Sequence, residues 1–383
     1  MSETGCILQF GGGNFLRAFV DLFLQELNDS GEPGGEVTVV QSTTSRRAEQ
    51  INAQKGRYHV ILRGIREGEK VDEVHPVSSI RRALVAAHEW DDLRAIAASD
   101  SLELIVSNTT EAGLELEEGD SMTGSSPRTS PRTSPRTCPV SFPAKLALLL
   151  HERYVASGLR ISVLPCELVD GNGARLRELV LEQARLWGME DAYVNWLSSE
   201  VVWLTTLVDR IVSGRPAAHP LLEQDPLLTV AEPYAFWAIE DGGEHHRLYD
   251  HPAIQRVPDV TPFALRKVRI LNGAHTALVA KALPMGIETV REAVAHPDVR
   301  PWLERLLEEE IVPVVTDRVA DAEGFAATIL ERFENPFLDH RLSDIALHHE
   351  TKVAHRLRPT YQEYVQRFGE APTLLAELVR SGG

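Results

Sequence analysis

The stretch CILQFGGGNFLR at residues 6–17 joins a short apolar run to a glycine turn and then to apolar residues at helical spacing. A strand, a glycine turn and a helix in this order open a dinucleotide-binding unit. Glycine is needed there because a Cβ would hold the backbone away from the pyrophosphate, which binds the free N–H groups of the helix N-terminus. Gly11 and Gly13 match the first two glycines of the G-x-G-x-x-G pattern, whereas Leu16 replaces the third. Taken alone, the stretch is also compatible with a plain glycine turn.

The second strand leaves the choice between NAD and NADP open. Residues 36–41 are rich in β-branched side chains and follow at the expected distance. The acidic residue that binds the ribose hydroxyls of NAD is missing from the end of this strand, where Gln41 stands. Arg46 and Arg47 follow a few residues later and are candidates for holding the 2′-phosphate of NADP. The alternative is that they are two solvated arginines at the start of a helix.

The first half of the chain alternates between strand and helix signals, which predicts a Rossmann-like, doubly wound parallel sheet. The predicted strands are 6–10, 36–41, 58–62, 102–107 and 161–166, and helices are expected at 142–154 and 174–187. After about residue 256 the strand signals stop, and helices are expected at 265–283, 287–295, 301–307, 325–332, 340–348 and 360–368. We therefore expect a dinucleotide-binding domain at 1–256 and a mostly α-helical domain at 257–383.

An insertion at about residues 120–139 interrupts the first domain. It contains consecutive Ser-Pro-Arg-Thr repeats over 126–137. A repeat rich in proline and serine has no apolar side chains to bury, so we expect a disordered surface loop. The alternative is that its arginines contact an acidic partner.

The composition narrows the class of protein. The 383 residues include 39 Lys and Arg against 56 Asp and Glu, which gives a formal net charge of −17. This charge argues against a nucleic-acid or anionic-membrane partner. No apolar run reaches a membrane-spanning length, the first residues do not resemble a signal peptide, and Cys6, Cys138 and Cys166 lack metal-binding spacing. We expect a cytoplasmic protein without a metal site, and the sequence does not predict its oligomeric state.

Residues 266–276, RKVRILNGAHT, carry polar groups within an apolar helix. In a regular helix Lys267, Asn272 and His275 would lie at about 0°, 140° and 80° around the axis, on one face. Carbonyl reduction needs such a set, because an ammonium can protonate the nascent alkoxide while an amide orients it. Burial beside two arginines is expected to lower the pKa of Lys267. Taken singly, the alternatives are a surface lysine, a turn asparagine and a core histidine.

Together these motifs resemble the long-chain mannitol dehydrogenase family of polyol and sugar-acid oxidoreductases. The segments that carry the resemblance run in family order over most of the chain, at residues 7–19, 106–113, 165–168, 207–212, 231–234 and 267–275. They look most like the branch that interconverts D-tagaturonate and D-altronate. The resemblance implies NAD as cofactor and a sugar acid as the small-molecule substrate. The alternatives are fructuronate, mannitol or mannitol 1-phosphate as substrate, or a catalytically inactive, cofactor-binding relative.

The resemblance also implies roles for individual residues. Lys267 matches the catalytic lysine, Asn272 the asparagine that binds the reacting oxygen, and His275 the substrate-binding histidine. Asp209 matches an active-site aspartate, for which the alternative is a salt bridge with Arg210. The expected cofactor contacts are Gly11, Gly13, Asn14, Phe15, Asn108, Thr109 and Glu111.

The sequence departs from the family at two places. Mannitol dehydrogenases carry a Cys-Asp-Asn segment whose amide helps to hold the reacting oxygen, and the segment here is Cys166-Glu167-Leu168. Relatives continue with further helices beyond the position of Gly383, so we expect a chain that is either naturally short or cut back. A hexuronate also needs a cationic anchor for its carboxylate, and the candidates are Lys352, Arg356, Arg210 and Arg269.

Overall fold

The computed structural model describes residues 5–31, 34–43, 46–109, 113–117, 120 and 138–381. Glu111 and the Ser-Pro-Arg-Thr repeats lie outside these residues. The chain divides into two compact units, of which the first comprises Met1–Ile61, Val74–Ala231 and Ala235–Pro258. The second comprises Leu62–Glu73, Glu232–Tyr234 and Asp259–Gly383. Two short segments that were expected in the first domain, Leu62–Glu73 and Glu232–Tyr234, therefore group with the helical unit.

The first unit contains a six-stranded parallel sheet with the order β5-β2-β1-β6-β7-β8. Its strands are β1 (Cys6–Phe10), β2 (Glu36–Gln41), β5 (Ile80–Val85), β6 (Leu102–Ser107), β7 (Ile161–Pro165) and β8 (Val201–Trp203). The chain first adds strands on one side of β1 and then returns to pair β6 on its other side. This reversal is the switch point at which doubly wound sheets bind ligands, beside the carboxyl ends of the strands. The predicted Rossmann-like fold is confirmed.

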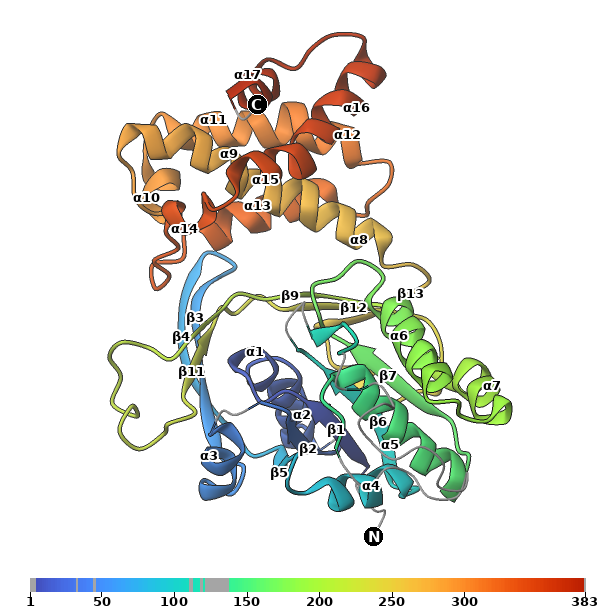
Figure 1. The fold of residues 1–383 in the computed structure, drawn as a ribbon. Helices are drawn as coiled ribbons and strands as arrows, with labels where there is room; N and C mark the ends of the chain where they lie inside the picture. The colour runs from blue at the N-terminus through green and yellow to red at the C-terminus, as the bar shows by residue number, and fades with distance from the viewer. Residues whose placement is uncertain are drawn as a thin grey trace. The chain divides into compact units, whose positions relative to one another are not determined.

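Helices cover this sheet, which explains why β1, β2 and β7 are buried over nearly their whole length. Four of them share one apolar core with the sheet: α4 (Trp90–Ala98), α5 (Phe142–Ala156), α6 (Asn172–Leu186) and α7 (Asp191–Ser199). Three further helices lie nearer the N-terminus: α1 (Asn14–Arg17), α2 (Val20–Asp29) and α3 (Arg47–Ala53). Figure 1 shows α1 and α2 directly after β1. The glycine turn therefore connects the central strand to the first helix, as the sequence predicts.

Two smaller sheets complete the strand structure. One has the order β10-β11-β3-β4 and the other the order β13-β12-β9. Their strands are β3 (Tyr58–Arg66), β4 (Glu69–Val77), β9 (Thr206–Asp209), β10 (Val212–Gly214), β11 (Thr229–Ala231), β12 (Phe236–Glu240) and β13 (Ile254–Val257). The predicted strand at 58–62 does form, but it extends to Arg66 and belongs to the four-stranded sheet.

The second unit is helical and has its own apolar core. Its helices are α8 (Thr261–Arg266), η4 (Lys267–Asn272), α9 (Gly273–Ala282), η5 (Leu283–Met285), α10 (Val290–Ala295), α11 (Val299–Arg305), η6 (Leu306–Ile311), α12 (Val312–Val315), α13 (Ala322–Phe333), α14 (Leu342–Ile345), α15 (His349–Arg356), α16 (Arg358–Phe368) and α17 (Thr373–Ser381). The predicted change from strands to helices after residue 256 matches β13, which ends at Val257. Within the described ranges, no helix has the length and apolar character that crossing a membrane requires.

Candidate functional site

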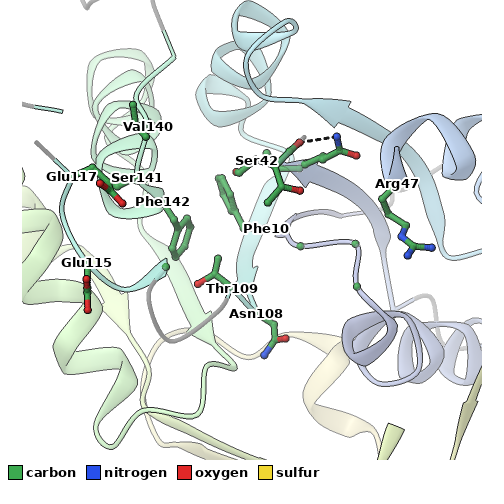
Figure 2. Close-up of a pocket in the computed structure, with 17 residues that line it drawn as sticks. Phe10, Ser42, Arg47, Asn108, Thr109, Glu115, Glu117, Val140, Ser141 and Phe142 are labelled. Carbon is green, nitrogen blue, oxygen red and sulfur yellow. Dashed lines mark hydrogen bonds between the residues drawn. The ribbon is translucent and has the colours of Figure 1, made fainter. Parts of the chain in front are cut away.

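A cavity of about 520 Å³ opens at the switch point of the parallel sheet (Figure 2). This volume suits a small-molecule or cofactor site. The cavity is lined by Phe10, Gly11, Gly12, Gly13, Val40, Gln41, Ser42, Thr43, Arg47, Asn108, Thr109, Gly113, Glu115, Glu117, Val140, Ser141 and Phe142. Four of the expected cofactor contacts, Gly11, Gly13, Asn108 and Thr109, therefore lie together. Asn14 and Phe15 instead begin α1 and are not among the described residues that line the cavity.

The glycine turn requires glycine for two different reasons. Gly11 has a φ of +119°, and a Cβ added to it would lie 2.9 Å from the carbonyl oxygen of Asn108. Gly13 has an ordinary φ of −68°, and an added Cβ would have no neighbour within 4 Å. The first glycine therefore permits the turn itself, whereas the second keeps the floor of the cavity open. Leu16, at the third position of the pattern, packs beneath Gly11.

Arg17 holds the glycine turn from below, a role that was not expected from the sequence. Its side chain is 1% exposed and donates hydrogen bonds to the carbonyl oxygen of Gly12, to Asn14 Oδ1 (2.7 Å) and to the carbonyl oxygen of Leu227 (3.0 Å). Burial lowers the pKa of the guanidinium to about 10, so it stays charged at neutral pH. The arginine of the Gly-Asn-Phe-Leu-Arg motif was visible in the sequence, but its partners were not.

A buried carboxyl group lies close to this arginine. Asp21 Oδ2 accepts a hydrogen bond from Gln9 Nε2 (3.3 Å). Tyr58 Oη lies 3.5 Å from the same carboxylate oxygen, and its single hydrogen is shared with the backbone oxygen of Arg17, which lies 2.8 Å away. Asp21 Oδ1 has no hydrogen-bond partner among the described residues. Burial raises the pKa of Asp21 to about 7, despite the lowering effects of Gln9 and Arg17. The support of the glycine turn therefore contains a group that titrates near neutrality.

Glu167 orders the opposite wall of the cavity. Its carboxylate accepts hydrogen bonds from the backbone N–H of Thr109 (2.8 Å), from Thr109 Oγ1 (3.0 Å) and from Ser107 Oγ (3.0 Å). Beside it, Asn108 Nδ2 donates to the backbone oxygen of Cys166 (2.8 Å). These bonds tie the end of β6 to the end of β7. The sequence showed only that an amide is missing at this segment, and the structure shows that the carboxylate positions Thr109, which lines the cavity.

The arginines after β2 differ in their surroundings. Arg46 is exposed and pairs with Glu49 at 2.7 Å. Arg47 lines the cavity and has no carboxylate within salt-bridge distance in the described part of the chain. Burial and the nearby Arg215 lower the pKa of Arg47. Figure 2 shows Arg47 at one end of the cavity and Glu115 with Glu117 at the other.

The predicted catalytic residues Lys267 and Asn272 lie in the second unit, at the two ends of η4. This segment is a π-helix, so the expectation of a regular helix with 100° per residue is wrong for it. A π-turn closes on the fifth residue along, which brings the side chains of residues 267 and 272 toward one face. Both residues are half-buried. Isolated π-turns are rare and occur frequently at functional sites.

His275 lies one turn further along, in α9. Its imidazole is 7% exposed and contacts the rings of Phe333 (4.4 Å) and His340 (4.9 Å). Burial, together with His340, Arg332 and Arg356, holds the pKa of His275 well below its usual value, so the ring is neutral. One ring nitrogen is hydrogen-bonded to the backbone of Leu271, whereas Nε2 has no partner among the described residues. Nδ1 therefore carries the proton, and Nε2 is left as an acceptor for a hydroxyl group.

Asp209 lies in the first unit, at the end of β9, where it pairs with Phe236 of β12. It is 5% exposed. The following Arg210 is also buried and donates to the backbone oxygen of Ala18 at 3.0 Å, between α1 and α2. Asp209 is not among the described residues that line the 520 Å³ cavity.

Comparison with known proteins assigns the chain to a family. The model of the mannitol dehydrogenase Rossmann domain matches residues 6–249, and the model of the mannitol dehydrogenase C-terminal domain matches residues 259–381. The chain is 37% identical over 391 residues to an altronate oxidoreductase of Bacillus subtilis (strain 168), which covers 96% of this chain and 77% of the relative. It is 40% identical over 384 residues to an altronate oxidoreductase of Halalkalibacterium halodurans, and this alignment covers 96% of this chain and 72% of the relative.

Two solved structures share the fold at 21% sequence identity. A D-sorbitol dehydrogenase in substrate-free form has a TM-score of 0.79 over 96% of this chain and 79% of its own. A Pseudomonas fluorescens mannitol 2-dehydrogenase, solved as a ternary complex with NAD and D-mannitol, has a TM-score of 0.76 over 100% of this chain and 79% of its own. Fold and sequence thus define an oxidoreductase that acts on CH–OH groups. The chain belongs to the mannitol dehydrogenase family.

The described residues contain no group of three or more His, Cys, Asp or Glu side chains arranged to hold a metal ion. The three cysteines are free thiols, with Cys166 buried and the others half-buried.

Proposed function

We propose that the chain is an NAD-dependent tagaturonate reductase, also called an altronate oxidoreductase, which interconverts D-tagaturonate and D-altronate. The observation that carries this proposal is the identity of 36–40% to altronate oxidoreductases over 96% of the chain. The alternative substrates are fructuronate, mannitol and mannitol 1-phosphate.

The cavity at the switch point fits a dinucleotide. Because Gly13 has free space above it, the pyrophosphate can approach the backbone at the start of α1. Asn108 and Thr109, held by Cys166 and Glu167, form the wall at the end of β6. When bound, the nicotinamide cofactor supplies or accepts the hydride. The residues of the cavity hold and orient it, and Glu111 remains a proposed contact that lies outside the described residues.

The polar residues of η4 and α9 provide the acid–base chemistry. The Lys267 ammonium gives its proton to the alkoxide oxygen that develops when a ketone is reduced, and takes the proton back in the reverse direction. The Asn272 amide donates to the same oxygen and fixes its direction. The neutral His275 accepts a hydrogen bond at Nε2 from a neighbouring substrate hydroxyl. Asp209 is proposed as a further active-site group.

Exchange of the lysine tests this assignment. The Lys267→Met variant should lose at least about 100-fold in kcat for D-tagaturonate with NADH, because general acid catalysis contributes about 10²–10⁴-fold. Its affinity for NADH should stay close to that of the wild type. Lys281→Met is the matched control, since Lys281 lies on α9 near the Trp302 ring. Turnover by Lys267→Met at the wild-type rate would refute the proposed role.

A panel of substrates tests the specificity. D-Tagaturonate, D-fructuronate, mannitol and mannitol 1-phosphate would be compared by the change in nicotinamide absorbance. The proposal predicts the highest kcat/KM for D-tagaturonate. Binding of NADH without turnover of any hexuronate would favour a catalytically inactive relative instead.

A further inference from the structure

The proposed substrate carries a carboxylate, and the following inference rests on the proposed function. Of the four candidate cations, two are already engaged. Arg269 forms an ion pair with Glu363 (2.8 Å) and donates to Thr360 Oγ1 (2.9 Å). Arg210 is committed to the backbone of Ala18. The remaining candidates, Lys352 and Arg356, both lie on α15.

Arg356 is fixed against the helix that carries the proposed catalytic residues. α15 packs against α9 within the helical unit (Figure 1). Arg356 NH1 donates to Thr276 Oγ1 at 3.3 Å, and Thr276 Oγ1 in turn donates to the backbone oxygen of Asn272 at 2.8 Å. Thr276 directly follows His275 in the chain. The guanidinium is therefore held within one helical turn of both the oxygen-binding amide and the hydroxyl-accepting imidazole.

No acidic side chain of the described residues neutralises the charge of Arg356. Arg356 is half-buried, and no carboxylate lies within 4 Å of it in the described ranges. Arg332, the other arginine near His275, forms a buried ion pair with Glu232 at 2.7 Å. Lys352, one turn before Arg356 on α15, adds a second positive charge and donates to the backbone oxygen of Ile345 at 2.7 Å. A partly desolvated cation beside a second cation favours an anion as ligand.

The geometry of arginine suits a carboxylate. A guanidinium presents five N–H donors in a planar fork and binds a carboxylate through two parallel hydrogen bonds. The bond to Thr276 engages NH1, so donors on NH2 and Nε remain for a ligand. The charge of Arg356 acts on His275, and the Nε2 atom of this ring, which has no partner among the described residues, can accept a hydroxyl of the same molecule. We propose that Arg356 anchors the substrate carboxylate and thereby selects sugar acids over neutral sugars.

Kinetics on a charged and an uncharged substrate test this proposal. D-Tagatose has a hydroxymethyl group where D-tagaturonate has its carboxylate. In Arg356→Met the KM for D-tagaturonate should rise about 10- to 100-fold, since a hydrogen-bonded charge pair is lost, while kcat changes far less. Turnover of D-tagatose should stay the same. Arg356→Lys should restore part of the affinity, because the charge returns without the fork.

Arg358→Met is the matched control, since Arg358 is half-buried like Arg356 and lies two residues further along, in α16. An unchanged KM for D-tagaturonate in Arg356→Met would overturn the proposal. An equal loss on D-tagatose would also overturn it, because that result indicates a structural role. Melting curves of both variants show whether the fold is kept.

Binding measurements separate this proposal from the proposed function. Calorimetry with D-altronate and with its uncharged counterpart D-altritol needs no turnover. If the wild type binds D-altronate and Arg356→Met does not, the anchor stands even where D-tagaturonate is not reduced. If the wild type turns over D-tagaturonate but Arg356→Met binds D-altronate normally, only the anchor fails. If the wild type neither binds D-altronate nor reduces D-tagaturonate, both proposals fail.

Discussion

Two alanine substitutions in the glycine turn should differ in their effect on the stability of the fold. Gly13→Ala introduces a methyl group into open space at a φ of −68°, which alanine adopts without strain. The free energy of unfolding of the cofactor-free protein should therefore stay the same or rise by about 0.4–1 kcal/mol. Gly11→Ala puts a Cβ at a φ of +119° and 2.9 Å from a backbone oxygen. It should lower the free energy of unfolding by about 1–3 kcal/mol.

Cofactor binding should respond to Gly13→Ala, although the fold does not. The new methyl group would occupy the space in which we place the pyrophosphate. Overpacking of this kind costs about 1–3 kcal/mol, which corresponds to a rise of about 10- to 100-fold in the Kd for NADH. Fluorescence titration with NADH measures the Kd, and denaturant unfolding measures the stability. Wild-type affinity for NADH in Gly13→Ala would show that the dinucleotide does not lie against this turn.

Two further substitutions probe the polar groups around the cavity. Arg47→Met should reduce kcat/KM with NADPH more than with NADH, because Arg47 is the cation that lines the cavity among the described residues. Arg46 is exposed, so Arg46→Met serves as the control. An equal effect on both cofactors would contradict a contact between Arg47 and the 2′-phosphate. Asp21 has a pKa raised from 3.8 to about 7, so the folded state binds its proton more tightly and stability falls as the pH rises through this window. Between pH 5 and 8 the free energy of unfolding should fall by up to roughly 3 kcal/mol. Asp21→Asn should flatten this pH dependence. A wild-type free energy of unfolding that does not fall over this range would contradict the raised pKa.

The sequence predicted the parts of the fold that depend on local patterns. The run from Cys6 to Phe10, the glycines after it and the strand at 102–107 are apolar segments bounded by turns, and they form β1, the glycine turn and β6. The short strands of the two smaller sheets were largely missed, since strands such as β10 and β11 have only three residues each and no periodicity to detect.

Site residues that lie in one segment could be predicted from the sequence. Site residues whose partners are distant in the chain could not. Lys267, Asn272 and His275 lie within nine residues, so their common helix was visible. The π-turn was missed because arguments from periodicity assume a regular helix. The roles of Arg17 and Glu167 were missed because their partners are distant in sequence. Arg17 bonds a residue 210 positions away, and Glu167 bonds residues 58 and 60 positions away. The choice of Arg356 over Arg269 likewise required the contacts of α15 and α16.

The most direct test of the proposed function is to identify the product that the wild-type chain makes. The purified protein would be incubated with D-tagaturonate and NADH, and the product analysed by chromatography beside authentic D-altronate. One D-altronate should form for each NADH oxidised. Consumption of NADH without D-altronate, or no consumption with any hexuronate, would contradict it.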